Sequence, residues 1–284
     1  MSPPAEPAAL ELRTIGGPSA FGGDSRRFWN LVRLTAAADF KTRYLSSWLG
    51  YAWSLLRPLL FFGVLYLVFT RVIRFGDQVE NYAALLLLNI MLFQFFQDAT
   101  GSAVRCVVQR ESLVRKMQFP RIVVPLSVVL NASMTALMNL VAALVLIIAI
   151  GVEPRWTWLL LPVILAALLV FTTGVSLALA ALYPRFRDVE QIWTVASRAL
   201  FYASPVIYPI EFVPESWRAL VAANPLTPIL EQARIWVIDP SAPDLVETAG
   251  SAAALLIPVA IFVGVCAVGF WLFEREAPRV AEEL

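Results

Sequence analysis

Long apolar runs alternate with short polar segments along most of the chain. A helix needs about 20 mostly apolar residues to cross a hydrocarbon core of about 30 Å, and most of these runs approach that length. We interpret six of them as transmembrane helices. They are Leu55–Thr70, Tyr82–Val104, Ile122–Ile150, Leu159–Leu182, Ile192–Tyr208 and Ser251–Phe273. The fifth run is the least regular, because it has only 17 residues, carries Arg198 and is interrupted by Pro205.

The positions of Lys and Arg orient these helices, since positive charges are enriched in the short cytoplasmic segments of membrane proteins. With the N-terminus in the cytoplasm, the cytoplasmic segments carry 15 Lys and Arg residues and the external segments carry 5. The cytoplasmic segments are then 1–53, 105–121, 183–191 and 274–284. We therefore expect a multi-pass protein with both termini in the cytoplasm, a six-helix domain over 54–273, and a cytoplasmic tail from residue 274.

The N-terminal region has a different pattern. Residues 1–24 are rich in Pro, Ala and Gly and lack the apolar stretch of a signal peptide, so we expect a disordered cytoplasmic tail. Residues 25–53 lead into the first span. From about Ser25 to Phe40 the polar and apolar positions separate onto different faces of a helix. The polar stripe is Arg26, Asn30, Arg33 and Lys41, and the apolar positions are Phe28, Leu31, Val32 and Ala36. This predicts an amphipathic helix in the membrane interface. The alternative is a surface helix of a small cytoplasmic domain, for which no nearby core is evident.

Between the fifth and sixth runs, the external segment is too apolar for a solvated loop and is punctuated by proline. Pro followed by Glu begins one short helix at Pro214-Glu215, and a second begins at Thr227-Pro228. Asn224-Pro225 separates them. Since backbone at membrane depth must be helical or buried in protein, we predict a pair of re-entrant helices over about 209–240 that dip into the outer leaflet. The alternative is a folded cap on the external face.

Composition supports the membrane assignment and excludes several activities. Hydrophobic residues make up 59% of the chain and charged residues 15%, against about 45–50% and about 25% in soluble domains. There is no His, and Cys106 and Cys266 alone cannot hold zinc, so we expect no metal site. No phosphate-binding loop precedes either lysine, so ATP hydrolysis by that route is excluded. The net charge of +1 gives no indication of nucleic acid binding.

Several motifs occur in an order that is similar to one family of permeases. The segment from Arg43 to Trp53, followed by Pro58, resembles the R-Y-x-x-S-x-L-G-x-x-W-x-x-x-x-P lead-in to the first span of ABC-2 type polysaccharide exporters, the permease subunits related to Wzm and TagG or TarG. Further matches are Glu111 to Lys116 with Phe119-Pro120, Arg187-Asp188, Pro205 to Pro209, and Asn224-Pro225-Leu226. The resemblance covers about residues 28–273. The family more often has Asn where Glu111 stands.

This resemblance implies a function and its partners. The permease would work as a homodimer in the bacterial plasma (inner) membrane, with two copies of a separate ATPase that binds ATP and Mg. It would export a polyprenyl-diphosphate-linked glycan, of the O-antigen type, or a teichoic acid precursor. No cofactor is expected in this chain itself, and neither is an enzymatic activity.

The resemblance also suggests roles for particular residues. A short, charged cytoplasmic turn suits docking of the ATPase, although positive charges there also serve topology. The residues proposed for this coupling are Arg110, Glu111, Arg115, Lys116, Arg187 and Asp188. Arg43 and Arg57 are candidates to contact the lipid diphosphate, the alternative for Arg57 being an ordinary lipid headgroup. The candidates for an external gate are Trp217, Asn224, Pro225 and Trp236; the tryptophans could instead anchor at the interface.

A glycan slides best past aromatic faces, which contact sugar C–H groups without many directional hydrogen bonds. In the family the first and fifth spans line the channel, and both spans carry aromatic residues here. The candidates are Phe62, Tyr66, Phe69, Phe201, Tyr202 and Tyr208. Aromatic residues at helical spacing can equally pack or face lipid.

Two other functions remain open at this level. An ABC-2 exporter of a small drug or natural product is one, although it would not need a channel for an extended chain. The other is a membrane-embedded glycosyl- or phosphotransferase, which would need clustered carboxylates near one membrane face. The carboxylates here are scattered, with no D-x-D or D-D pair.

Overall fold

The chain folds entirely into helices and connecting loops where its structure is described. The computed structural model describes residues 25–44, 48–110, 120–244, 246–247 and 252–283, and none of these residues forms a strand. The α-helices are α1 (Ser25–Tyr44), α2 (Trp48–Leu67), α3 (Tyr82–Gln109), α5 (Val123–Ile150), α6 (Leu161–Leu182), α7 (Val189–Ala203), α8 (Glu215–Ala223), α9 (Leu226–Val237) and α11 (Leu256–Glu283). The predicted tail over 1–24 lies outside the described residues. The all-α prediction is confirmed for the rest.

Within this described part, five helices are long and apolar enough to cross a membrane. They are Ala52–Val72, Tyr82–Gln109, Val123–Ile150, Trp156–Leu182 and Ala253–Glu276. The first continues α2 through a π-helical turn at Val68–Val72, and the fourth joins a 3₁₀ turn at Trp156–Leu160 to α6. Each overlaps one of the six runs expected from the sequence, and α11 continues without a break as far as Glu283, within the expected tail.

The predicted span Ile192–Tyr208 does not form one long helix. It contains α7, which has 15 residues and ends where Ser204 becomes extended with φ −98° and ψ 153°. Pro205 explains this end, because a proline disfavours helical geometry in the residue before it. At 1.5 Å per residue, α7 is about 22 Å long, less than the hydrocarbon core of about 30 Å. A sixth crossing would therefore need the non-helical segment after Ala203 as well.

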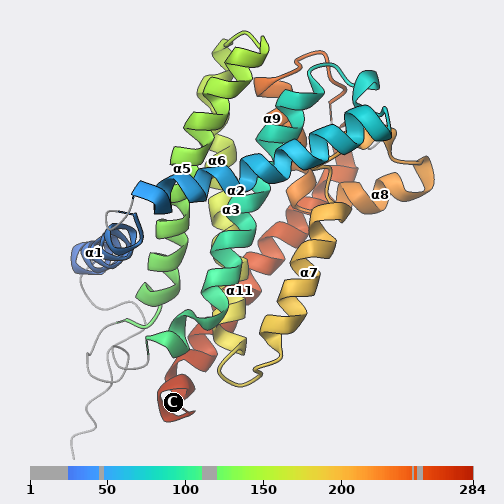
Figure 1. The fold of residues 1–284 in the computed structure, drawn as a ribbon. Coiled ribbons are helices and arrows are strands. Elements are labelled where there is room, and N and C mark those ends of the chain that lie inside the picture. Colours follow the sequence, from blue (N-terminus) through green and yellow to red (C-terminus); the bar gives the residue numbers. More distant parts are fainter. Residues whose placement is uncertain (1–24, 45–47, 111–119, 245, 248–251, 284) are drawn as a thin grey trace, which may run out of the picture.

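α3 is the central helix of the bundle. Most of its side chains are buried, including the run Leu85–Leu88, and it contacts α2, α5, α6, α7 and α9. By contrast α2 and α11 leave most of their apolar side chains exposed. Figure 1 shows α2 crossing the bundle at a steep angle to α3, α5 and α7. Lipid tails are as apolar as a protein core, so exposed apolar faces are expected of helices at the lipid boundary.

α6 and α11 pack closely along a seam of small residues. A Cβ on Gly269 would lie 2.0 Å from the carbonyl oxygen of Gly174, and a Cβ on Gly174 would lie 2.8 Å from the Cα of Cys266. Only glycine permits this approach of the two backbones. Close packing of small residues is a principal source of helix association in a bilayer, where apolar burial contributes little.

The apolar face of α1 packs on the protein, contrary to the expectation that no core could receive it. Phe28, Val32 and Ala36 are buried. They lie against a cluster formed by one end of α3, α5, α6 and α11, which includes Val107, Val123, Ala180 and Phe273. The exposed face of α1 carries Trp29 and Leu34 together with Arg26, Arg33 and Lys41. Its interfacial position stays a prediction, with this outer face toward the lipid headgroups.

Two short helices occupy the segment between α7 and α11, as the proline pattern predicts. α8 begins at Glu215, directly after Pro214, which agrees with the expected start. α9 begins at Leu226, one residue before the expected Thr227, because Pro225 already adopts helical dihedral angles. Their re-entrant position in the outer leaflet stays a prediction.

Candidate functional site

A polar and aromatic surface is built where α7 packs on α3. The indole Nε1 of Trp193 donates a hydrogen bond of 3.1 Å to Thr100 Oγ1, and Gln97 Nε2 donates one of 3.3 Å to the carbonyl oxygen of Ser197. Arg105, near the C-terminal end of α3, forms an ion pair with Glu190 in the first turn of α7. These contacts set the rotation of α7 and turn its opposite face outward.

The outward face of α7 mixes a cation with apolar and aromatic side chains. Ile192, Val195, Arg198 and Tyr202 are all exposed. A guanidinium at the depth of a membrane helix is costly against lipid tails and normally faces protein or water. This face therefore differs from the largely apolar exposed surface of α11.

An aromatic cluster joins α2 to α7 beside this face. Phe61 on α2 contacts Phe201 at 5.5 Å between ring centroids, and Phe201 contacts Tyr202 edge-on at 5.2 Å. On α2, Phe62 stacks on Tyr66 at 5.7 Å. Phe61 thus joins α2 to two of the six predicted channel residues, Phe201 and Tyr202, while Phe62 and Tyr66 form a separate pair on α2.

Among these residues, the two tyrosines are the ones available at the surface. Tyr202 is 61% exposed and Tyr66 is 37% exposed, whereas Phe201 is only 5% exposed. Phe201 packs between Phe61 and Phe93, so it supports Tyr202 from behind.

The last two predicted channel residues, Phe69 and Tyr208, contact residues close to them in the chain. Phe69 lies edge-on to Phe75 at 6.4 Å, and the Tyr208 hydroxyl donates a hydrogen bond of 2.8 Å to the carbonyl oxygen of Tyr202. Phe61 was not among the predicted channel residues. Nothing in the sequence shows that Phe61, and not its neighbour Phe62, contacts α7.

Of the predicted coupling residues, Arg110 has a defined structural contact. It forms an ion pair with Asp39 on α1 and donates a hydrogen bond of 2.9 Å to Ser127 Oγ on α5. Arg110 thus ties α1 to the end of α3 and the start of α5. Glu111, Arg115 and Lys116 lie outside the described residues.

The corner between α6 and α7 carries the other two coupling candidates. Arg187 lies over the ring of Tyr183, 5.1 Å from its centroid, and Arg185 lies 5.3 Å from that of Phe186. Asp188 is exposed at the start of α7. Since Glu190 pairs with Arg105 on α3, this corner is also joined to the C-terminal end of α3.

Arg57 lines a cavity of about 500 Å³ between α1, α2, α3 and α5. The walls of the cavity are about equally polar and apolar, and most of them belong to helices that the bilayer would surround. The side chain of Arg43, the other predicted lipid-diphosphate contact, is outside the described part of the structure.

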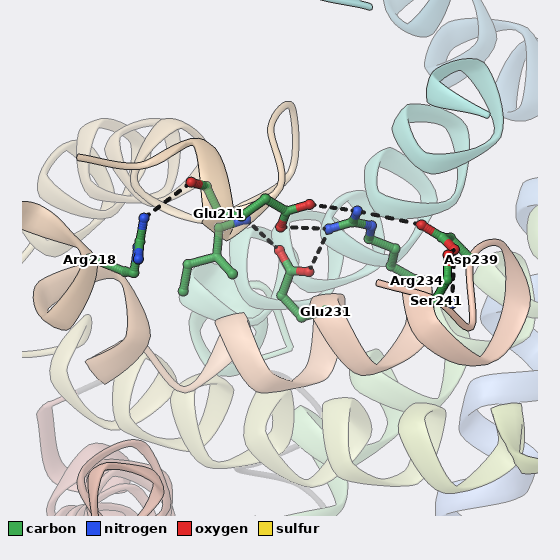
Figure 2. Close-up of polar contacts among 7 residues, drawn as sticks. Glu211, Arg218, Glu231, Arg234, Asp239 and Ser241 are labelled. Atoms are coloured by element: carbon green, nitrogen blue, oxygen red, sulfur yellow. Dashed lines mark hydrogen bonds and ion pairs between the residues drawn. The ribbon is translucent and has the colours of Figure 1, made fainter. Parts of the chain in front are cut away.

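The segment between α7 and α11 is held by a buried ion cluster, which Figure 2 shows. Arg234 forms a two-pronged ion pair with Glu211, with nitrogen to oxygen distances of 2.7 and 2.9 Å. It also donates to Glu231 at 3.3 Å and lies 3.8 Å from Asp239. The other carboxylate oxygen of Glu231 accepts the backbone N–H of Ile210 at 2.9 Å. The cluster fastens the 3₁₀ turn Ile210–Phe212 to α9.

Burial raises the pKa of the Glu231 carboxyl. Its carboxyl is 3% exposed. Desolvation raises the pKa of Glu231 from 4.5 to about 7, while Arg234 and the Ile210 N–H oppose the shift without cancelling it. Desolvation also lowers the pKa of Arg234, but its hydrogen bonds to Glu211 and its pairing with Glu231 outweigh this, and the net shift is upward. Three carboxylates therefore share one guanidinium in a buried position.

The four predicted gate residues have different environments. Trp217 on α8 is 61% exposed. Trp236 on α9 is partly buried, and its carbonyl oxygen accepts a hydrogen bond from Thr157. Asn224 holds the connection between α8 and α9, because its Oδ1 accepts the Leu226 N–H at 3.0 Å and its Nδ2 donates to Ser204 Oγ at 2.8 Å. Asn224 and Pro225 thus shape the turn that places the two helices.

The residues that the structure describes include no group of three His, Cys, Asp or Glu side chains able to hold a metal ion. The arrangement is suited to binding a ligand or a partner, because one helical bundle carries an aromatic surface, a partly polar cavity and charged corners.

These features define the class of the molecule as an all-α integral membrane protein with a polar and aromatic face. Residues 30–237 match the family described as ABC-2 type transporter. The chain therefore belongs to that family. The match covers the bundle from α1 through α9.

Curated relatives match most of the chain. It is 30% identical over 203 residues to the O-antigen export system permease protein RfbA of Klebsiella pneumoniae, covering 71% of this chain and 78% of that protein. It is 32% identical over 194 residues to the protein of the same name in Myxococcus xanthus, covering 68% and 74%. A more distant similarity, 18% over 201 residues, is to the polysialic acid transport protein KpsM of Escherichia coli, covering 69% and 76%.

Proposed function

We propose that this chain is the permease subunit of an ABC transporter that exports a lipid-linked polysaccharide across the bacterial plasma membrane. The observation that carries the proposal is the similarity, over about three quarters of their length, to permeases named for O-antigen export. A third relative is named for the transport of polysialic acid, another polysaccharide. The cargo is a polyprenyl-diphosphate-linked glycan of the O-antigen type, with a teichoic acid precursor as the related alternative.

The polysaccharide passes along the face formed by α2 and α7. Tyr66 and Tyr202 are its main contacts, because both are exposed and both are aromatic. Phe62 and Phe201 hold these tyrosines, and Phe69 and Tyr208 complete the support. A second copy of the chain closes the passage. Arg198 favours this arrangement, since it is exposed on the same face and its charge is poorly suited to lipid.

ATP hydrolysis takes place on two copies of a partner ATPase at the cytoplasmic face. The partner docks on the 105–121 segment, with Glu111, Arg115 and Lys116, and on the α6–α7 corner, with Arg187 and Asp188. Arg110 positions the first of these sites through Asp39 and Ser127. Both termini lie in the cytoplasm, and the segment from α7 to Tyr208 completes a sixth crossing.

On the external side, α8 and α9 act as a gate that dips into the outer leaflet. Trp217 is suited to contact the cargo or lipid, since it is exposed. Trp236, Asn224 and Pro225 fix the two helices relative to α6 and to each other. The buried ion cluster around Arg234 keeps this unit rigid.

The experiment that tests the function is depletion of this protein in its host, followed by measurement of polyprenyl-linked glycan in the membrane and of polymer at the cell surface. We expect lipid-linked polymer to accumulate inside while the surface polymer disappears. A plasmid copy of the wild-type chain should reverse both changes. Unchanged glycan in both places would refute the proposal and favour export of a small molecule.

A further inference from the structure

The exposed positions of α3 form one polar stripe. α3 is the most buried of the five helices able to span a membrane, and its exposed residues all lie in its C-terminal half. They are Asp98, Gly101, Ser102, Arg105 and Gln109. The spacings i, i+3, i+4, i+7 and i+11 place them on one side of the helix, and none carries a large apolar side chain. Since polar groups on a membrane helix normally face protein or water, this side of α3 is turned away from lipid tails.

The cavity between α1, α2, α3 and α5 takes in most of this stripe. Asp98, Ser102 and Gln109 line it, together with Gln94 one turn before Asp98. The first three are exposed, so a ligand inside the cavity can reach their polar atoms. The volume of about 500 Å³ lies within the range of pockets that hold small molecules. α3 therefore presents accessible hydrogen-bonding groups to a space that has room for a ligand.

The charges on the described walls of the cavity balance. Two lining residues are acidic, Asp39 and Asp98, and two are basic, Arg57 and Arg110. Asp39 and Arg110 pair with each other at one end of the cavity. Asp98 accepts a hydrogen bond of 2.8 Å from Gln94 Nε2, and a carboxylate can accept several such bonds. Balanced charge favours a neutral ligand over an anion, and hydroxyl groups suit these walls because a hydroxyl both donates and accepts.

An aromatic side chain completes the lining. Trp53 near the start of α2 is 62% exposed and lines the same cavity. The flat face of an indole packs against C–H groups, while its neighbours in the cavity bind polar groups. A sugar ring has both kinds of surface, since its faces carry C–H groups and its edge carries hydroxyls. The combination of Trp53 with the polar stripe of α3 therefore fits a sugar better than a purely apolar or purely ionic ligand.

We propose that this cavity binds a neutral sugar unit, with the ring against Trp53 and its hydroxyls in hydrogen bonds with Asp98 and Ser102. The site is separate from the aromatic face of α2 and α7, because neither Tyr66 nor Tyr202 lines the cavity. That the bound sugar is a unit of the exported glycan rests on the proposed function. Binding of the sugar itself does not.

The binding test uses the full chain in complex with its partner ATPase, purified in detergent. Two neutral trisaccharides without lipid or phosphate, maltotriose and mannotriose, are titrated separately up to their solubility limits while thermal unfolding is followed. Glycerol 3-phosphate, which also carries hydroxyls but is an anion, is the comparison probe. We expect at least one trisaccharide to raise the unfolding midpoint and glycerol 3-phosphate to leave it unchanged.

Exposed residues allow variants that leave the fold intact. Trp53→Leu and Asp98→Ala should each weaken binding of the stabilising trisaccharide roughly tenfold, which corresponds to one hydrogen bond to a charged group or its equivalent in ring contact. Asp98→Asn keeps an acceptor at the same place and should weaken binding less than Asp98→Ala. Trp29→Leu is the matched control, since Trp29 on α1 is 52% exposed but does not line the cavity.

The outcomes are distinct. No stabilisation by either trisaccharide, equal stabilisation by glycerol 3-phosphate, or unchanged binding in both Trp53→Leu and Asp98→Ala overturns the sugar site. In the host, Asp98→Ala should reduce surface polymer at an equal level of protein; normal polymer despite lost binding would overturn the assignment to the exported glycan. Failure of the depletion experiment with retained trisaccharide binding would reject the export function and leave the sugar site standing.

Discussion

Two glycines on α11 provide a matched test of its packing against α6. In Gly269→Ala, the new Cβ would lie 2.0 Å from the carbonyl oxygen of Gly174, about 1.4 Å inside the 3.4 Å at which ordinary contact begins. The obstacle is backbone, which cannot rotate away. In Gly264→Ala, the new Cβ would meet nothing within 4 Å. The same substitution on the same helix therefore clashes at one position only.

The difference between the two variants isolates the clash. Alanine stabilises a helix relative to glycine by about 1 kcal/mol, and this gain is common to both. Overpacking a well-packed core costs about 1–3 kcal/mol. We therefore expect Gly269→Ala to be less stable than Gly264→Ala by about 1–3 kcal/mol, with Gly264→Ala equal to the wild type or more stable.

The measurement is thermal unfolding of the purified permease and ATPase complex in one detergent, followed by tryptophan fluorescence. Gly174→Ala is a third variant, for which we expect a loss of stability because its Cβ would lie 2.8 Å from the Cα of Cys266. Equal unfolding midpoints for Gly269→Ala and Gly264→Ala would refute the close α6–α11 seam, and a lower midpoint for Gly264→Ala would contradict its assignment to the lipid boundary.

Three further predictions concern other parts of the molecule. Arg105→Glu should lower the unfolding midpoint only slightly, because Arg105 is half exposed and an exposed ion pair contributes little; the double exchange Arg105→Glu with Glu190→Arg should restore the midpoint. Since the pKa of Glu231 is raised from 4.5 to about 7, its protonation stabilises the fold fully below about pH 4.5, and this contribution is lost as the pH rises through about 7. Glu231→Gln should flatten that dependence in unfolding measured from about pH 4 to about pH 8, and an unchanged slope would contradict the burial argument. Tyr66→Ala should slow export of long glycan chains more than of short ones, as measured by the length distribution of surface polymer, whereas equal slowing would show that Tyr66 only packs.

The sequence alone predicted the local features of the fold well. Long apolar runs indicated the five helices that are able to span a membrane, because length and hydrophobicity are properties of the segment itself. Pro214 followed by Glu215 correctly indicated the start of α8, because this signal also depends only on neighbouring residues in the chain. The run Ile192–Tyr208 was expected to be interrupted at Pro205, and α7 ends at Ala203, just before that proline. That this run forms a sixth span stays a prediction.

The candidate site was less predictable. Aromatic residues on the first and fifth runs could be identified, but Phe201 and Tyr202 are neighbours in the chain, and only the packing of α7 on α3 makes one buried and the other exposed. The cavity that Arg57 lines depends on the path of α2 across α3 and α5.

The sequence by itself determined which segments belong in the bilayer, which turns end them and which family the motifs resemble, because each of these depends on neighbouring residues. Only the tertiary structure decided which apolar faces meet protein and which meet lipid. α3 is largely buried and α2 largely exposed, yet both are apolar runs. The physical reason is that lipid tails and a protein core are equally apolar, so hydrophobicity places a helix in the membrane without selecting its neighbours.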